Sequence, residues 1–141
     1  MKKLTVLFIL AVSLMLGNVH AQSYKVIVNN INEIGSISKK ELAMVFLKKK
    51  KKWENGVMII PVDQSVRAKV RASFSQDVFN KSVAAIRSYW QRAIFSGMAT
   101  APVEKPTDKE IIAFVKNNKG AIGYVSSATS TAGVKTLVIK K

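Results

Sequence analysis

The sequence predicts an α/β domain: a mixed, mostly parallel sheet flanked by helices in a three-layer-like arrangement. Short β-branched runs alternate with segments whose apolar residues recur every three or four positions, as in strands joined by helices. Two Ser/Thr-x-x-Glu capping boxes mark where helices begin. The chain has 141 residues, 48% of them hydrophobic and 22% charged, which is the composition of a single globular domain.

Residues 1–21 predict a secretory signal peptide. A basic start precedes the apolar run Leu4–Leu16, and small residues precede a cleavage site between Ala21 and Gln22. This run of 13 residues is shorter than a membrane span, which needs about 20. We therefore expect export to the periplasm and a mature domain formed by residues 22–141.

The first half of that domain predicts two strands, each followed by a helix. Tyr24–Asn29 is the first strand, and Ser38-Lys39-Lys40-Glu41 opens a helix at about Lys39. Val57–Val62 is nearly all apolar, as in a strand buried on both faces, with Pro61 expected at its end because proline cannot donate to a sheet. The next helix follows from Asp63, and its apolar residues recur every four positions: Val66, Val70, Phe74 and Val78.

The second half predicts two more helices and two strands. Ser82 caps a helix that runs to about Phe95, and Gly97 suits the left-handed position just beyond it. After a loop over 98–106, Thr107-Asp108-Lys109-Glu110 opens the last helix. The last strands are Ala121–Val125 and Val134–Ile139. On the helix capped by Ser82, the expected core-facing residues are Ile86, Tyr89, Trp90, Ala93 and Ile94. We expect Trp90 to share one core with Phe46, Phe74, Ile122 and Tyr124.

Charge and residue types restrict the function. The formal charge is +15, and without the signal peptide 21 basic and 8 acidic side chains remain, a formal charge of +13. This excess indicates an anionic partner. The predicted mature domain has neither His nor Cys, which excludes Ser-His and Cys-His catalysis and His-ligated metals. We expect a protein that is not an enzyme and that needs no cofactor or metal.

The residues Gln64-Ser65-Val66-Arg67 form the first candidate anion site. If a helix begins there, its free N–H groups, the Ser65 hydroxyl and the Arg67 guanidinium converge. The loop beginning Ser126-Ser127 follows a strand end and is the candidate second wall. The alternative is that Ser65 only caps a helix and that the loop is ordinary. The lysine run Lys48–Lys52 is either a solvated helix end or an attractor of anions.

Several motifs resemble the phosphate-type periplasmic substrate-binding family of ABC transporters, in its short single-domain branch. They are Trp53-x-Asn55-Gly56, Pro61-Val62-Asp63-Gln64, Trp90 with Phe95-Ser96-Gly97, and, as the most specific, Gly120-Ala121-Ile122-Gly123-Tyr124-Val125. The resemblance implies one lobe of a type II periplasmic binding protein. It also implies that Asp63 and Ser65 correspond to an anion-holding Asp-Gly-Ser-Gly-Thr segment, whose glycines and threonine are absent here.

The leading interpretation is an exported binder of phosphate or a related oxyanion, associated with phosphate uptake. The first alternative is an accessory adaptor that binds no ligand and docks on a membrane transporter or porin complex. The second is a general basic binder of polyanions, which predicts binding that falls steeply with salt. Nucleic acid is not the expected partner.

Overall fold

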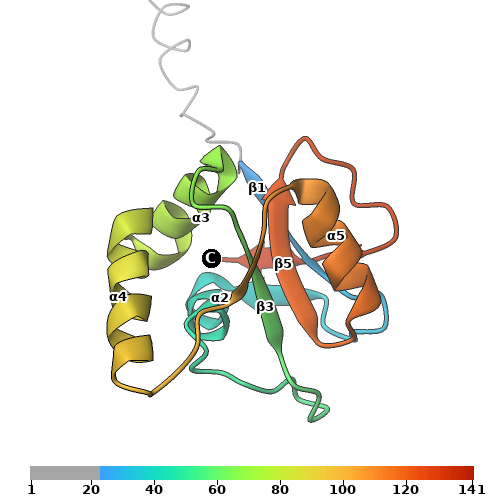
Figure 1. Ribbon diagram of the computed structural model, residues 1–141. Helices are drawn as coiled ribbons and strands as arrows, with labels where there is room; N and C mark the ends of the chain where they lie inside the picture. The colour runs from blue at the N-terminus through green and yellow to red at the C-terminus, as the bar shows by residue number, and fades with distance from the viewer. Residues whose placement is uncertain (1–22) are drawn as a thin grey trace, which may run out of the picture.

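The computed structural model describes residues 23–141, so the predicted signal peptide and its cleavage site lie outside the described residues (Figure 1). The strands are β1 (Tyr24–Val28), β2 (Ser36–Ser38), β3 (Ile60–Gln64), β4 (Val103–Lys105), β5 (Ala121–Ser126), β6 (Lys135–Thr136) and β7 (Val138–Lys140). The helices are α2 (Lys39–Phe46), α3 (Lys69–Phe79), α4 (Val83–Phe95) and α5 (Asp108–Asn117).

The central sheet has the strand order β4-β3-β5-β1-β6. Strand β3 is parallel to both β4 and β5, while β1 is antiparallel to both β5 and β6. Within this sheet, β1 therefore runs against the other four strands, and the predicted mixed, mostly parallel sheet is confirmed. Strands β2 and β7 form a separate small parallel pair.

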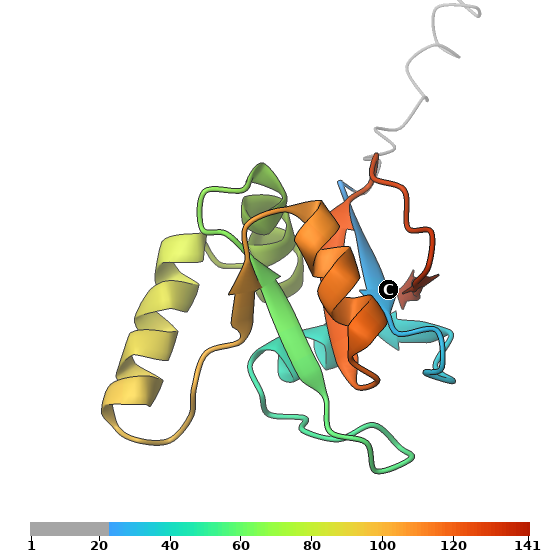
Figure 2. The same cartoon turned by 45° about the vertical axis from the view of Figure 1, so that its right-hand side comes forward.

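Helices cover both faces of the sheet, which gives three layers (Figures 1 and 2). On the face covered by α2 and α3, the Phe74 ring stacks on the Tyr124 ring with centroids 3.8 Å apart. Phe46 meets Phe74 edge-on at 4.9 Å. On the other face, Ile111 and Val115 of α5 pack on residues of β1, β3 and β5. The core on the α2 and α3 face contains four of the five residues expected together: Phe46, Phe74, Ile122 and Tyr124.

The predicted helix caps are confirmed. Ser38 Oγ accepts a hydrogen bond from the Glu41 N–H, and Thr107 Oγ1 accepts one from the Glu110 N–H. Ser82 Oγ accepts from the Ala85 N–H at the start of α4. Gly97 has a φ of +71°, the left-handed conformation expected just past that helix.

The predicted strand Val57–Val62 is displaced toward the C-terminus. Residues 51–59 instead fold back on themselves, with Trp53 N–H donating to Val57 O and Ile59 N–H donating to Lys51 O, and they leave Val57 and Met58 exposed. Strand β3 therefore starts at Ile60, and Pro61 is its second residue rather than its last. The pairing with β4 begins only at Val62, so no residue of β4 needs a backbone N–H donor at Pro61.

Other boundaries also differ from the prediction. Strands β2 and β4 are short pieces of segments predicted as connections. The last strand is divided into β6 and β7 at buried Leu137, whose N–H donates to Val26 O across the sheet. Helix α3 begins at Lys69, so Val66 is not in it as predicted, because residues 65–68 form a turn in which the Ala68 N–H donates to Ser65 O.

Helix α4 has the predicted bounds but not the predicted contacts. It packs beside α3, away from the sheet (Figures 1 and 2). Of its expected core face, Ile86 and Trp90 are buried, while Ile94 is exposed. Trp90 lies outside the aromatic core, and it lines a small cavity with Asp63 and Arg71. Its predicted membership of that core is wrong, because α4 packs beside α3 and Trp90 faces this cavity instead.

Candidate functional site

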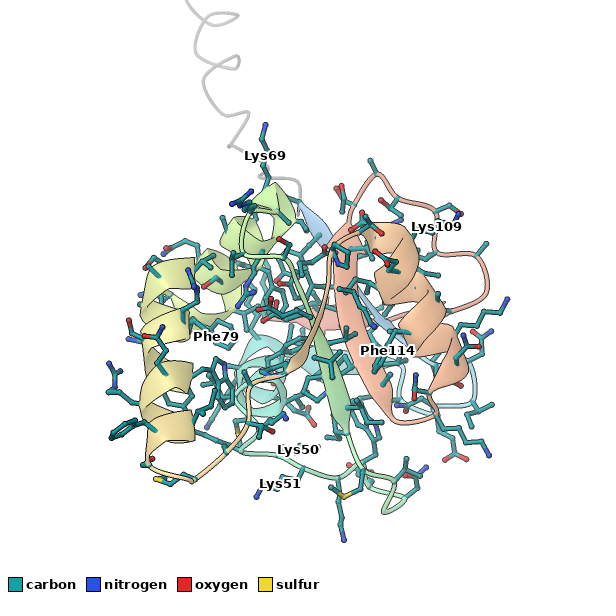
Figure 3. The ribbon with its side chains drawn as sticks, viewed as in Figure 1. Lys50, Lys51, Lys69, Phe79, Lys109 and Phe114 are labelled. Atoms are coloured by element: carbon teal, nitrogen blue, oxygen red, sulfur yellow. The ribbon has the colours of Figure 1, made fainter. Side chains whose placement is uncertain are left out.

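Three parallel strands end at the same edge of the sheet. They are β3, β4 and β5, whose last residues are Gln64, Lys105 and Ser126. The starts of α3 and α5 lie at this edge too, where Figure 3 shows Lys69 and Lys109. The carboxyl ends of parallel strands, together with helix N-termini, are the usual place for ligands in open α/β sheets. We call this region the carboxyl edge.

The side chain of Gln64 is not available to a ligand at this edge. It is 1% exposed, and its Nε2 donates to Asp108 Oδ1 at 2.6 Å and to the carbonyl oxygen of Tyr124 at 3.0 Å. The Gln64 amide therefore joins β3 to β5 and to the start of α5. Its role in the fold is to hold these three elements together.

The carboxylate of Asp108 collects hydrogen bonds at the first position of α5. Its Oδ1 accepts from Gln64, and its Oδ2 accepts from the Ser126 N–H at 3.1 Å and from Thr129 Oγ1 at 2.6 Å. An amide, a backbone N–H and a hydroxyl at a helix N-terminus are the donors expected around a bound oxyanion. The Asp108 carboxylate therefore accepts the hydrogen bonds that these donors would otherwise offer to a bound anion. The sequence indicated only a first-turn residue there.

The start of α3 differs from the starts of the other three described helices in having no side-chain cap. Its N-cap residue, Ala68, makes no side-chain cap, whereas the starts of α2, α4 and α5 are capped by Ser or Thr. Ser65 Oγ accepts weakly from the Arg67 N–H, at 3.3 Å. Val66 and Arg67 are exposed in the turn. Cationic Arg67 and Lys69 therefore flank a helix start whose first N–H groups have no side-chain acceptor.

The six predicted site residues divide into two groups. Gln64 and Ser126 meet at Asp108, and Ser127 is exposed with its N–H donating to Ser23 O. Ser65, Val66 and Arg67 lie in the turn before α3. The structure thus brings the two predicted walls to one edge through Gln64 and Ser126, and their role in binding an anion stays a prediction.

A buried ionic cluster lies beneath this edge. Arg71 Nη1 donates to Glu104 Oε1 at 2.6 Å and to Gln64 O at 2.8 Å, and Arg71 Nη2 lies 3.4 Å from Asp63 Oδ2. The Tyr124 hydroxyl donates to Asp63 Oδ1. Arg71 is therefore already paired with two carboxylates. Arg67 precedes helix α3 and is exposed, whereas Arg71 lies within the helix and is buried.

Burial decides the protonation of two groups in this cluster. It raises the pKa of the Asp63 carboxyl, and the nearby Arg71 charge and Tyr124 hydroxyl offset this only in part. Burial and the adjacent Asp63 also raise the pKa of Tyr124. Tyr124 therefore stays protonated and remains a donor. No signal in the sequence marked this cluster, because its members come from four separate elements.

Within residues 23–141, no three His, Cys, Asp or Glu side chains gather closely enough to hold a metal ion. None of the helices described is both long and apolar enough to cross a bilayer.

No protein-family model matches the chain, and no curated protein matches it. Solved structures do match. An ABC-type phosphate transport receptor from Vibrio cholerae superposes with a TM-score of 0.68 at 15% identity, covering 84% of this chain and 46% of that one. A putative phosphate ABC transporter substrate-binding protein with bound phosphate, from Clostridium perfringens, gives 0.65 at 16% identity, with 83% and 46% covered. PstS from Borrelia burgdorferi gives 0.65 at 14% identity, with 84% and 47% covered.

The chain thus spans less than half the length of each of these structures. At such identities the likeness concerns the fold, and it extends over most of the described domain. Residues 23–141 therefore have the fold of one lobe of these phosphate-transport binding proteins.

Proposed function

We propose that this protein binds phosphate or a related oxyanion as an exported, non-enzymatic component of phosphate uptake. One observation carries the proposal: the domain has the fold of one lobe of phosphate-transport proteins, one of them solved with phosphate bound. The formal charge of +13 left after removal of the predicted signal peptide favours the same class of ligand. Membrane transporter or porin components are its proposed partners, and the periplasm is its proposed location.

The proposed contact is the start of α3. An oxyanion there would accept from the first N–H groups of the helix, where Ala68 provides no side-chain acceptor. The exposed Arg67 guanidinium and the Ser65 hydroxyl stand directly before the helix. The buried Arg71 is not part of the proposal, because Asp63 and Glu104 already neutralise it.

The binding is expected to be weak. The described residues offer one wall of a site, and the donors at the start of α5 are taken by Asp108. An oxyanion at α3 would keep much of its hydration, which points to dissociation constants of about a millimolar.

The occupied donors at α5 also favour a second candidate function. The Asp108 carboxylate already accepts from the donors that could hold an anion at the start of α5. This is what we expect of an adaptor that has kept the fold but binds no ligand. The two functions differ in one measurable property, the saturable binding of phosphate.

Calorimetric titration of the protein and of two variants with phosphate tests the proposal. Arg67→Ala should weaken binding about tenfold or more, since hydrogen bonds to charged groups contribute about 1.5–3 kcal/mol, and Ser65→Ala should weaken it about fivefold. Arg87→Ala is the control, because it removes another exposed arginine, on α4. Absence of saturable binding would favour the adaptor. Equal losses in Arg67→Ala and the control would indicate diffuse attraction of anions.

A further inference from the structure

The end of α4 carries an unusual group of exposed apolar side chains. Phe95 is 97% exposed, Met98 81% and Ile94 52%, and the three lie within five residues of one another at the C-terminus of the helix and the turn at Gly97. We call these three residues the α4 tip. Apolar residues that gather at a projecting end, rather than standing singly, usually mark a surface that is covered by something else.

The chain around the α4 tip carries cations and no acidic residue. Between Asp77 and Glu104 the sequence has Lys81, Arg87 and Arg92 but neither Asp nor Glu. The segment between Glu41 and Glu54 likewise has five lysines and no acid. In a protein with 8 acidic residues this separation leaves two positively charged segments.

The fold brings these two segments together. Lys48 Nζ lies 3.3 Å from Thr100 Oγ1 and 3.4 Å from Ala101 O, which joins the lysine run to the loop just after the α4 tip. Lys49 and Arg92 line a groove of about 590 Å³ between α2, α3 and α4, with Leu47, Phe79 and Tyr89. Glu41 already pairs with Lys50, so it does not neutralise Lys49 or Lys51.

This region lies away from the carboxyl edge. Figure 3 shows Lys50 and Lys51 at the lower end of the molecule and Lys69 and Lys109 at the upper end. The C-terminus of α4 is at the same lower end in Figures 1 and 2. A contact made through the α4 tip therefore leaves the proposed phosphate site free.

We propose that the α4 tip docks on an anionic phospholipid bilayer. The apolar side chains would enter the level of the lipid headgroups and acyl chains, while Lys49, Lys51 and Arg92 contact the phosphates. An anionic bilayer matches both parts of this surface, because its acyl chains accommodate the apolar α4 tip and its phosphates attract the surrounding cations. A second copy of the chain would bring like charges together, and a neutral apolar partner would leave the cations unmatched.

Vesicle sedimentation with the mature protein tests this proposal. The protein should bind vesicles of equal parts phosphatidylglycerol and phosphatidylethanolamine, and bind pure phosphatidylcholine at least tenfold more weakly. The double variant Phe95→Ser, Met98→Ser should lose about tenfold or more in affinity, because the apolar area entering the bilayer is removed. The control is Ile31→Ser, Val138→Ser, which removes two exposed apolar residues elsewhere, 60% and 66% exposed, and should bind as the parent does.

The charged part of the surface is tested separately. Replacing Lys49, Lys51 and Arg92 by Gln should weaken binding by about fivefold for each cation, and added NaCl should weaken the parent but have less effect on this variant. A Phe95→Trp variant should show a blue-shifted emission that brominated lipids quench, since Trp53 and Trp90 are buried and stay out of the bilayer.

Three outcomes would overturn the proposal. They are no binding to the anionic vesicles, equal binding by the Phe95→Ser, Met98→Ser variant and the parent, or a dimer in sedimentation velocity that this variant abolishes. The last would assign the α4 tip to a second copy of the chain. These assays contain no free phosphate, and their variants change the α4 tip and its cations and not the start of α3. Their failure therefore leaves the proposed function untouched, and the calorimetry above leaves this proposal untouched.

Discussion

Replacing Gly120 by Ala tests why the most specific motif of the sequence has its glycines. A Cβ at Gly120 would lie 1.9 Å from Met58 O and 3.2 Å from Val57 Cγ1. The atom at 1.9 Å is the Met58 carbonyl oxygen, which belongs to the backbone, so a change of side-chain rotamer cannot move it. The segment cannot withdraw freely either, because Gly120 O accepts from the Ile60 N–H at 3.0 Å and from Trp53 Nε1 at 3.1 Å.

Two other glycines set the scale of the expected loss. Overpacking a core costs about 1–3 kcal/mol, and we place Gly120→Ala at the upper end, about 3 kcal/mol, because backbone must shift. At Gly123 a Cβ would lie 2.9 Å from Ile111 Cγ2 and from Val62 Cγ1, which are side-chain methyl groups that can adjust, so about 1–2 kcal/mol is expected. A Cβ added at Gly35 would have no neighbouring atom within 4 Å, so Gly35→Ala should leave stability unchanged or raise it by up to about 1 kcal/mol.

Urea unfolding followed by tryptophan fluorescence measures all three variants. With an m-value of about 1–3 kcal/mol/M, Gly120→Ala should lower the midpoint by roughly 1–3 M. Trp53 reports directly, since its indole N–H donates to Gly120 O. A loss of less than about 1 kcal/mol for Gly120→Ala, or a loss no greater than that of Gly35→Ala, would contradict this prediction, because the close approach of the Met58 carbonyl would then carry no cost.

Two further predictions concern the ionic groups. Asp108→Ala should lower the free energy of unfolding by about 2–3 kcal/mol, because three donors lose their acceptor, and millimolar phosphate should restore part of the loss in a thermal-shift assay. The control Glu110→Ala should lose less, and a melting temperature as high as the parent's for Asp108→Ala would contradict the prediction. A ¹³C NMR titration of the Asp63 carboxyl should give a midpoint above its ordinary value of about 3.9, and a midpoint at or below that value would contradict it. Since the folded-state pKa is raised, ionisation of Asp63 lowers the stability as the pH rises from the unfolded to the folded pKa, and Asp63→Asn should remove this part of the pH dependence.

The features that were predicted correctly are those that neighbouring residues decide. The caps at Ser38, Ser82 and Thr107 form within one helical turn, so their spacing in the sequence contains the whole interaction. The turn at Gly97 is local in the same way. The alternation of strands and helices then restricts the fold to an α/β domain, which the structure has.

The features that were missed depend on residues far apart in the chain. Asp108 stands 44 positions from Gln64, so its place in a first turn did not indicate that it gathers donors from β3 and β5. The burial of Arg71 and the exposure of Phe95 also depend on residues far away in the chain. A charged side chain is buried because two carboxylates meet it, and an aromatic side chain is exposed because α4 packs beside α3 and not on the sheet.

Titration of ¹⁵N-labelled protein without the predicted signal peptide with phosphate, followed by amide NMR, tests the central claim most directly. The account predicts saturable shifts of the amide signals centred on residues 65–70, at the turn and first residues of α3, with dissociation constants of about a millimolar. Those shifts should be absent in Arg67→Ala and present in Arg87→Ala. No saturable shift, or shifts confined to Lys48–Lys52, would contradict the claim that the carboxyl edge of this domain binds an oxyanion.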